Sequence, residues 1–111
     1  MDGFCTVDEL MDFIAKRIQA LREQKNVSAY SMSLELGQNN SYINKIENRK
    51  SNVSLEVLLY ICQYFNITIS DFFDTDIQYP IELQEHMNEA KKLDKKALQN
   101  LTEIARQLNE R

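Results

Sequence analysis

The scarcity of turn-forming residues constrains this chain more than any other feature. Its 111 residues include two glycines and one proline. Tight two-residue hairpins depend on glycine, and a protein built of short strands needs such turns at regular spacing. The sequence therefore predicts an all-α fold, in which helices are joined by short polar turns. The length suits one ordinary domain and excludes a multidomain enzyme or a large solenoid.

Apolar residues recur at three- and four-residue steps, which places them on one face of a helix. Together with polar residues that can cap helix starts, this spacing predicts helices over about 7–25, 29–36, 40–48 and 55–65, a short turn over 71–73, and two helices after residue 80. The segment 29–36 also alternates as a strand would, but no hairpin partner is evident, so we favour a helix. The expected caps are Thr6 with Glu9, Ser28, Asn39, Ser54, Ser70 and Asp94.

Two residues are expected in the left-handed backbone region. Gly37 follows the predicted helix 29–36, and the turn that it begins needs a residue tolerant of positive φ. Asn66 follows the helix 55–65, where a left-handed terminator belongs. These two positions set the sharpest changes of chain direction.

The net charge of −4 speaks against a nucleic-acid binder when it is taken alone. The charges are segregated, however. Residues 1–12 sum to −4, residues 13–50 to +4 and residues 51–111 to −4. Any surface for a polyanion is therefore expected within residues 13–50.

Several function classes find no support in the sequence. No apolar run approaches the ~18 residues of a membrane span, and the acidic start does not resemble a signal peptide, so we expect a cytoplasmic protein. Cys5, Cys62 and His86 lack the spacing of a zinc site or a catalytic nucleophile, and we interpret both thiols as structural. We predict neither an enzyme nor a bound metal or cofactor.

The predicted helix 40–48 has an unusual outward face. Opposite Ile43 and Ile46 it presents amides, a hydroxyl and a lysine, with no carboxylate: Asn40, Ser41, Asn44, Lys45 and Asn48. Asparagine can pair with the N6/N7 edge of adenine, and lysine can donate to guanine in the major groove. An ordinary solvated surface remains the alternative on composition alone.

Residues 14–73 resemble the phage Cro/CI repressor family, the Xre type of helix-turn-helix regulator. The resemblance depends on several motifs that occur in the family's order. They are Ile14-Ala15-Lys16-Arg17-Ile18 with Leu21-Arg22, Ser28, Gly37, Ser41-Tyr42-Ile43, Lys45-Ile46-Glu47-Asn48, Ser54-Leu55-Glu56, and Ile67-Thr68-Ile69-Ser70-Asp71-Phe72-Phe73. A glycine turn alone would be weak support, whereas this ordered set is specific.

The resemblance implies a five-helix lambda-repressor-like DNA-binding domain, with the helix 40–48 in the major groove of double-stranded DNA. It implies a structural ion pair between Arg22 and Glu47. The base-edge readers would be Asn39, Asn40, Ser41, Asn44 and Lys45. The expected phosphate contacts are Ser28, Tyr42, Asn48, Arg49 and Lys50.

The sequence departs from the family at three positions. Ala29 stands where the family commonly has glutamine, Arg49 where it usually has glycine, and Val53 where it has proline. The glutamine contact to phosphate is therefore lost. Because the glycine is missing, we expect a strained backbone at Asn48 or Arg49, or a different loop.

We expect three parts in the chain: a DNA-binding domain over 1–74, a linker over 75–80 and a helical extension over 81–111. Residues 81–108 carry apolar stripes too extensive to remain in water, so they either pair with a second chain or fold back. A homodimer through this extension is our prediction. The stripes consist of Leu83, Met87, Ala90 and Leu93, then Leu101, Ile104, Ala105 and Leu108.

The leading hypothesis is a sequence-specific DNA-binding transcriptional regulator, a repressor that acts as a dimer on a palindromic operator. The alternative is a protein-interaction module such as an antitoxin or a transcriptional bridging factor. A change at Lys45 separates the two, because a base reader would lose specificity while an interaction module would keep its partner.

Overall fold

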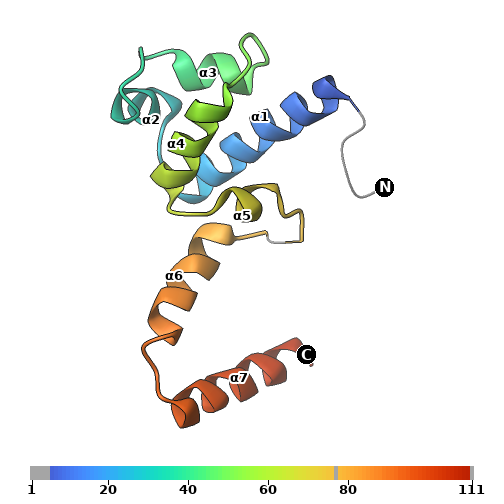
Figure 1. Cartoon of the computed structure of the whole chain (residues 1–111), viewed down its shortest axis with the longest axis vertical. Helices are drawn as coiled ribbons and strands as arrows, with labels where there is room; N and C mark the ends of the chain where they lie inside the picture. The colour runs from blue at the N-terminus through green and yellow to red at the C-terminus, as the bar shows by residue number, and fades with distance from the viewer. Residues whose placement is uncertain (1–5, 77, 111) are drawn as a thin grey trace. The chain divides into compact units, whose positions relative to one another are not determined.

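The computed structural model describes residues 6–76 and 78–110. The regular structure in these ranges is helical, which confirms the all-α prediction (Figure 1). The helices are α1 (Val7–Gln24), α2 (Ala29–Glu35), α3 (Tyr42–Glu47), α4 (Leu55–Phe65), α5 (Ile69–Phe73), α6 (Pro80–Ala90) and α7 (Lys95–Asn109). The segment 29–36, which could also have been a strand, is the helix α2.

The chain divides into two compact units, one that ends at Ile81 and one that begins at Glu82. The first unit contains α1 to α5 and the start of α6. Pro80 and Ile81 are buried in this unit, and Ile81 belongs to its hydrophobic core. The ordered part of the first unit therefore extends past residue 74, where we placed the start of the linker. The second unit holds the rest of α6 and α7.

The core of the first unit draws on α1 to α5. Its most deeply buried side chains expose 0 to 1% of their surface and include Ile18, Leu21, Met32, Ile43, Ile61, Phe65 and Phe72. The helices α2 and α3 pack on each other, α3 also packs on α1, and α5 packs on α4. The isoleucine side of α3 is therefore held by the core of the domain.

Most of the predicted caps are confirmed. The side chains of Thr6, Ser28, Ser54 and Asp94 each accept a hydrogen bond from the amide three residues later. Ser70 is a wrong prediction, because α5 begins one residue after Thr68 and the Thr68 hydroxyl accepts from the amide of Asp71 at 3.0 Å.

The predicted left-handed positions are also confirmed. Gly37 has a φ of 76° and Asn66 a φ of 58°. Asn66 is the C-cap of α4, and its amide donates to the carbonyl oxygen of Gln63 at 3.0 Å. Asn66 therefore ends α4, and Gly37 turns the chain from α2 toward α3.

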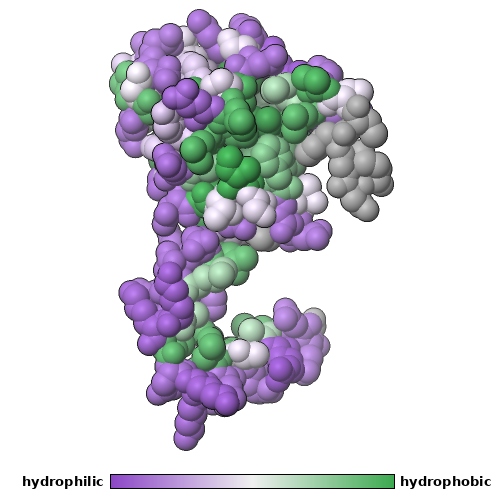
Figure 2. Space-filling view, in the orientation of Figure 1, coloured by the Kyte–Doolittle hydropathy of each residue, from purple (hydrophilic) through white to green (hydrophobic). Residues whose placement is uncertain are grey.

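Figure 2 shows hydrophobic side chains gathered on one face of the first unit, over α1 and α4. A hollow at this face is lined by residues of α1, α4 and α5, among them Leu10, Leu55 and Phe73. In the part of the chain that the structure describes, no helix is long and apolar enough to cross a membrane.

Candidate nucleic-acid interface

The helix α3 is shorter than the predicted 40–48. It begins at Tyr42, its N-cap is Ser41, and no side chain caps it. The prediction that Asn39 caps this helix is wrong. Instead the Asn39 Oδ1 accepts from the backbone N and the Oγ of Ser41, at 3.1 and 3.0 Å. An asparagine commonly closes a local turn in this way, so Asn39 and Asn40 lie in the turn before α3.

The two sides of α3 differ sharply in exposure. Ile43 and Ile46 expose 0% and 2% of their surface, whereas Asn44 and Lys45 are exposed. Asn39 and Asn40 are also exposed, and Ser41 is half-buried. The structure thus brings the five candidate base readers together along the turn and the outer side of α3.

Ser33 fixes the position of α3 on α2, a role that the sequence pattern did not reveal. It is the fully buried polar residue of α2, and its Oγ donates to the carbonyl oxygen of Ala29 at 2.7 Å. The same Oγ accepts from the amide of Ile43 in the first turn of α3 at 3.0 Å. One hydroxyl therefore satisfies an unpaired helix-start amide and joins the two helices.

Arg22 and Glu47 form an ion pair between α1 and the end of α3. The Arg22 Nε and Nη2 donate to the two carboxylate oxygens of Glu47 at 2.8 and 3.0 Å, while Nη1 donates to the carbonyl oxygen of Val27 at 2.9 Å. The side chains are only 16% and 8% exposed. The hydrogen bond to Glu47 raises the pKa of Arg22, so the guanidinium stays charged. The pair holds the angle of α3 on α1.

The candidate phosphate residues differ in what they already contact. The Ser28 Oγ accepts from the amide of Ser31 at 3.0 Å, and the Asn48 Nδ2 donates to the carbonyl oxygen of Asn44 at 2.9 Å. Tyr42 is half-buried, and burial raises the pKa of its hydroxyl. Lys50 is exposed.

Arg49 takes the left-handed conformation that a glycine at this position would adopt without strain. Its φ is 62°, whereas Asn48 stays at −92°. The guanidinium reaches back to α1, where Nη2 lies 2.7 Å from an oxygen of Asp8 and Nη1 lies 3.4 Å from an oxygen of Asp12. Sequence patterns did not identify these partners, because the pairs span about 40 residues of chain; the acidic block 1–12 was the available signal.

The two carboxylates that pair with Arg49 belong to a small charged cluster at the start of α1. Asp12 also pairs with Lys16 at 2.9 Å. The hydrogen bond from Lys16 is the main cause that lowers the pKa of Asp12, and the charge of Arg49 adds to it. Asp12 is therefore ionised at neutral pH.

The loop after α3 is tied to the helix itself. The amides of Lys50 and Ser51 both donate to the carbonyl oxygen of Lys45, at 2.8 and 3.2 Å. These two hydrogen bonds hold the start of the loop against the last turn of α3.

Metal or thiol chemistry has no support in the described residues. No three His, Cys, Asp or Glu side chains in these ranges are arranged to hold a metal ion. Cys62 is buried, and burial raises its pKa to about 11, so its thiol is unreactive near neutral pH. Cys5 lies outside the described residues.

Comparison with known proteins adds one match. A family model described as helix-turn-helix matches residues 18–72, a span that includes α2 and α3 whole. No curated protein and no solved structure matches the chain. One side of α3 packs in the core and the other is exposed. Together with this geometry, the match shows that the chain belongs to the Cro/CI-type helix-turn-helix family and is a DNA-binding helix-turn-helix regulator.

Proposed function

We propose that the protein is a sequence-specific transcriptional repressor that binds a palindromic operator as a homodimer. The observation that carries this proposal is the outer side of α3, where exposed Asn44 and Lys45 lie opposite the buried Ile43 and Ile46. A helix held in this way can enter the major groove as a rigid reader. Occupancy of the promoter would then exclude the transcription machinery.

Base choice falls to the amides and the lysine along α3 and its preceding turn. The amide of Asn44 can form a bidentate pair with adenine, and Lys45 can donate to O6 and N7 of guanine. Asn39, Asn40 and Ser41 extend this surface toward the start of the helix. Because Ser33 and the pair of Arg22 with Glu47 fix α3, these side chains reach the groove without a large loss of order.

Phosphate contacts set the register on the duplex and carry no sequence information. Lys50, on the loop tied to α3, is the exposed cation best placed for this role, and Ser28, Tyr42 and Asn48 add polar groups around the helix. Affinity should therefore fall with salt, with a slope of about −0.9 for each phosphate neutralised.

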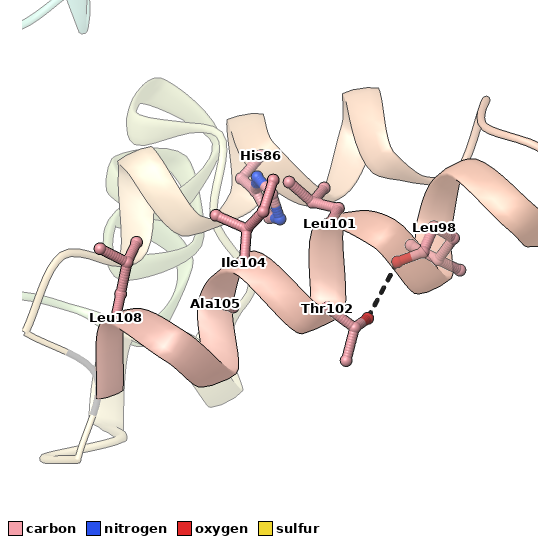
Figure 3. Close-up of a pocket in the computed structure, with 7 residues that line it drawn as sticks. All are labelled: His86, Leu98, Leu101, Thr102, Ile104, Ala105 and Leu108. Atoms are coloured by element: carbon pink, nitrogen blue, oxygen red, sulfur yellow. Dashed lines mark hydrogen bonds between the residues drawn. The ribbon is translucent and has the colours of Figure 1, made fainter. Parts of the chain in front are cut away.

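The second unit supports the homodimer. The helix α7 has no buried residue, and its apolar side chains line a hollow together with His86 of α6. Figure 3 shows Leu101 and Ile104 pointing toward His86. Ile104 and Leu108 remain 54% and 55% exposed, an apolar surface that a second copy would cover.

The charges of this unit are arranged to favour the same pairing. The helix α6 carries three glutamates and no lysine or arginine, whereas four lysines follow it: Lys91, Lys92, Lys95 and Lys96. In a two-fold antiparallel pairing, the acidic helix of one copy lies near the lysines of the other. A two-fold protein in turn calls for a two-fold operator.

Selection of duplexes from a random-sequence library by the purified protein tests this proposal. We expect a two-fold motif, with half-sites about 10 bp apart or a multiple of that spacing. An asymmetric motif would contradict the dimeric mode, and enrichment of no sequence at all would contradict sequence-specific binding.

Lys45→Ala tests the assigned reader. This variant should weaken operator binding by about 1–3 kcal/mol and relax the preference at one base pair of each half-site. Lys25→Ala, an equal change of charge at an exposed position after α1, is the matched control and should leave the preference unchanged. A uniform loss across all sequences for Lys45→Ala would assign this lysine to phosphate instead.

A further inference from the structure

Arg49 differs from Lys45 and Lys50, the other cations of α3 and of the loop after it, because its charge is already paired. Lys45 and Lys50 form no ion pair among the described residues, whereas the Arg49 guanidinium lies between Asp8 and Asp12. A cation on the loop that follows a DNA-reading helix is well placed to bind a phosphate. Here, however, the guanidinium of Arg49 is paired with two carboxylates of the same chain. The start of α1 thus presents to Arg49 the kind of oxygen that a DNA backbone would offer.

We propose that Asp8 and Asp12 compete with DNA phosphates for Arg49, so that the acidic start of α1 restrains DNA binding. The restraint ends when the guanidinium transfers from the carboxylates to the backbone of the duplex. This inference rests on the proposed placement of α3 in the major groove.

The loop geometry brings Arg49 to the edge of the groove. The amide of Lys50, the next residue, donates to the carbonyl oxygen of Lys45 at 2.8 Å, so Arg49 is held against the last turn of α3. Phosphates line both edges of the major groove. When Lys45 contacts a base, the loop at the end of the same helix meets the flanking backbone.

The ion pairs that hold Arg49 are of the kind that exchanges readily. The side chain of Asp8 is 88% exposed and that of Asp12 is 44% exposed, and such exposed pairs add little stability. The Arg49 Nε is buried and has no hydrogen-bond partner among the described residues. A phosphate can engage an arginine through two parallel hydrogen bonds, which the separate contacts to two aspartates do not provide.

The competing interpretation is that the two aspartates only anchor the loop. In that case their removal would loosen α3 and weaken DNA binding. The two interpretations predict changes of opposite sign, so neutral variants of the carboxylates separate them.

The experiment measures binding of the full chain to a mixed-sequence 30-bp duplex, because phosphate contacts do not depend on sequence. Four proteins form a cycle: wild type, Asp8→Asn with Asp12→Asn, Arg49→Gly, and all three changes together. Glycine is the matched replacement because it adopts a φ of 62° without strain. Asp76→Asn with Glu110→Gln changes two exposed carboxylates elsewhere and controls for net charge.

We expect the two asparagine changes to tighten binding at least about threefold at ~50 mM salt, and to make the salt slope steeper by about 0.9. Arg49→Gly should weaken binding much more in the asparagine background than in wild type. Equal tightening with and without Arg49, or equal tightening by the control pair, would overturn the proposal, as would weaker binding after the asparagine changes.

Thermal unfolding of each variant shows that it is folded under the assay conditions. Lys45→Ala, measured on a duplex that carries the selected operator and on the mixed-sequence duplex, keeps the two proposals distinguishable. If Lys45→Ala weakens binding to the operator more than binding to the mixed-sequence duplex while the asparagine changes have no effect, the competition fails and the placement of α3 stands. If no duplex is bound by any of the proteins, the proposed function itself fails.

Discussion

At the scale of single residues, the position of α3 depends on groups that hydrophobic patterns do not mark. Ser33 is fully buried in α2, where a serine would ordinarily be expected on the surface. Its hydroxyl both donates to Ala29 and accepts from Ile43, so no polar atom of the side chain is left unpaired. A buried polar group of this kind specifies one geometry because any other arrangement leaves it unsatisfied.

Ser33→Ala is expected to destabilise the first unit by about 1–3 kcal/mol, because the amide of Ile43 would be buried without a partner. Urea unfolding measures the change. Ser31→Ala, at an exposed position of the same helix, is the matched control and should stay within ~0.5 kcal/mol of wild type. Equal effects of the two changes would show that the hydroxyl bridge contributes no stability.

Cys62 gives the domain a dependence on alkaline pH. Burial raises the pKa of this thiol from 9.0 to about 11, so the folded protein keeps a proton that the unfolded chain releases. Stability is therefore full below about pH 9 and falls as the pH rises toward 11, by roughly 2 kcal/mol. Cys62→Ala should reduce this slope in urea unfolding at several pH values, and the part that remains at the highest pH belongs to Tyr64, whose pKa burial raises to about 12. A slope that Cys62→Ala leaves unreduced would assign the effect to other groups.

At the scale of elements, α3 is too short to be stable alone. Six residues form little more than one helical turn, and isolated helices of that length are not populated in water. The helix persists because Ile43 and Ile46 enter the core and because Glu47 pairs with Arg22 of α1. Its orientation therefore comes from tertiary contacts at both of its ends.

A double-mutant cycle on Arg22 and Glu47 tests this dependence. Glu47→Leu alone leaves a largely buried guanidinium without its carboxylate and should destabilise the domain by about 2–4 kcal/mol. Arg22→Met with Glu47→Leu should be less destabilised than the sum of the single changes, because neither charge then remains unpaired. Additive effects in urea unfolding would mean that the pair does not act as a unit.

At the scale of the whole molecule, the division of the chain falls inside α6. Pro80 and Ile81 belong to the core side of the first unit, although Pro80 also begins a helix that continues into the second unit. A cut between the two predicted parts at residue 74 would therefore remove core side chains. The boundary follows burial and does not follow the change in composition.

Two truncations test this division and the role of the second unit together. A chain that ends at Glu82 should be monomeric and fold stably, and it should bind the operator more weakly than the full chain. A chain that ends at Asp74 should be less stable by about 2 kcal/mol, because it lacks Ile81. Light scattering gives the mass and urea unfolding the stability. A truncated chain that is still a dimer after removal of residues 83–111 would contradict dimerisation through the second unit.

Much of the architecture could be predicted from local signals. Capping residues such as Ser54, the left-handed Asn66 and the apolar stripe of α4 act within a few residues of sequence, so each can be recognised without a structure. The start of α3 could not be predicted, because Asn39 can cap a helix or close a turn, and the choice depends on how α3 packs. The partners of Arg49 depend on contacts between distant segments, for which no local pattern exists.

The sequence by itself determined that this chain is helical, which residues start and end most helices, and that amides and a lysine would share one side of a short helix with isoleucines behind them. Those properties follow from the period of the helix and from the hydrogen bonding of residues close in sequence. Only the tertiary structure decided three further features: the hydrogen bond that joins Ser33 to α3, the ion pairs between Arg49 and the start of α1, and the burial of Ile81 in the core. These depend on which surfaces meet when the chain folds, because desolvation and charge pairing act between segments that sequence order does not relate.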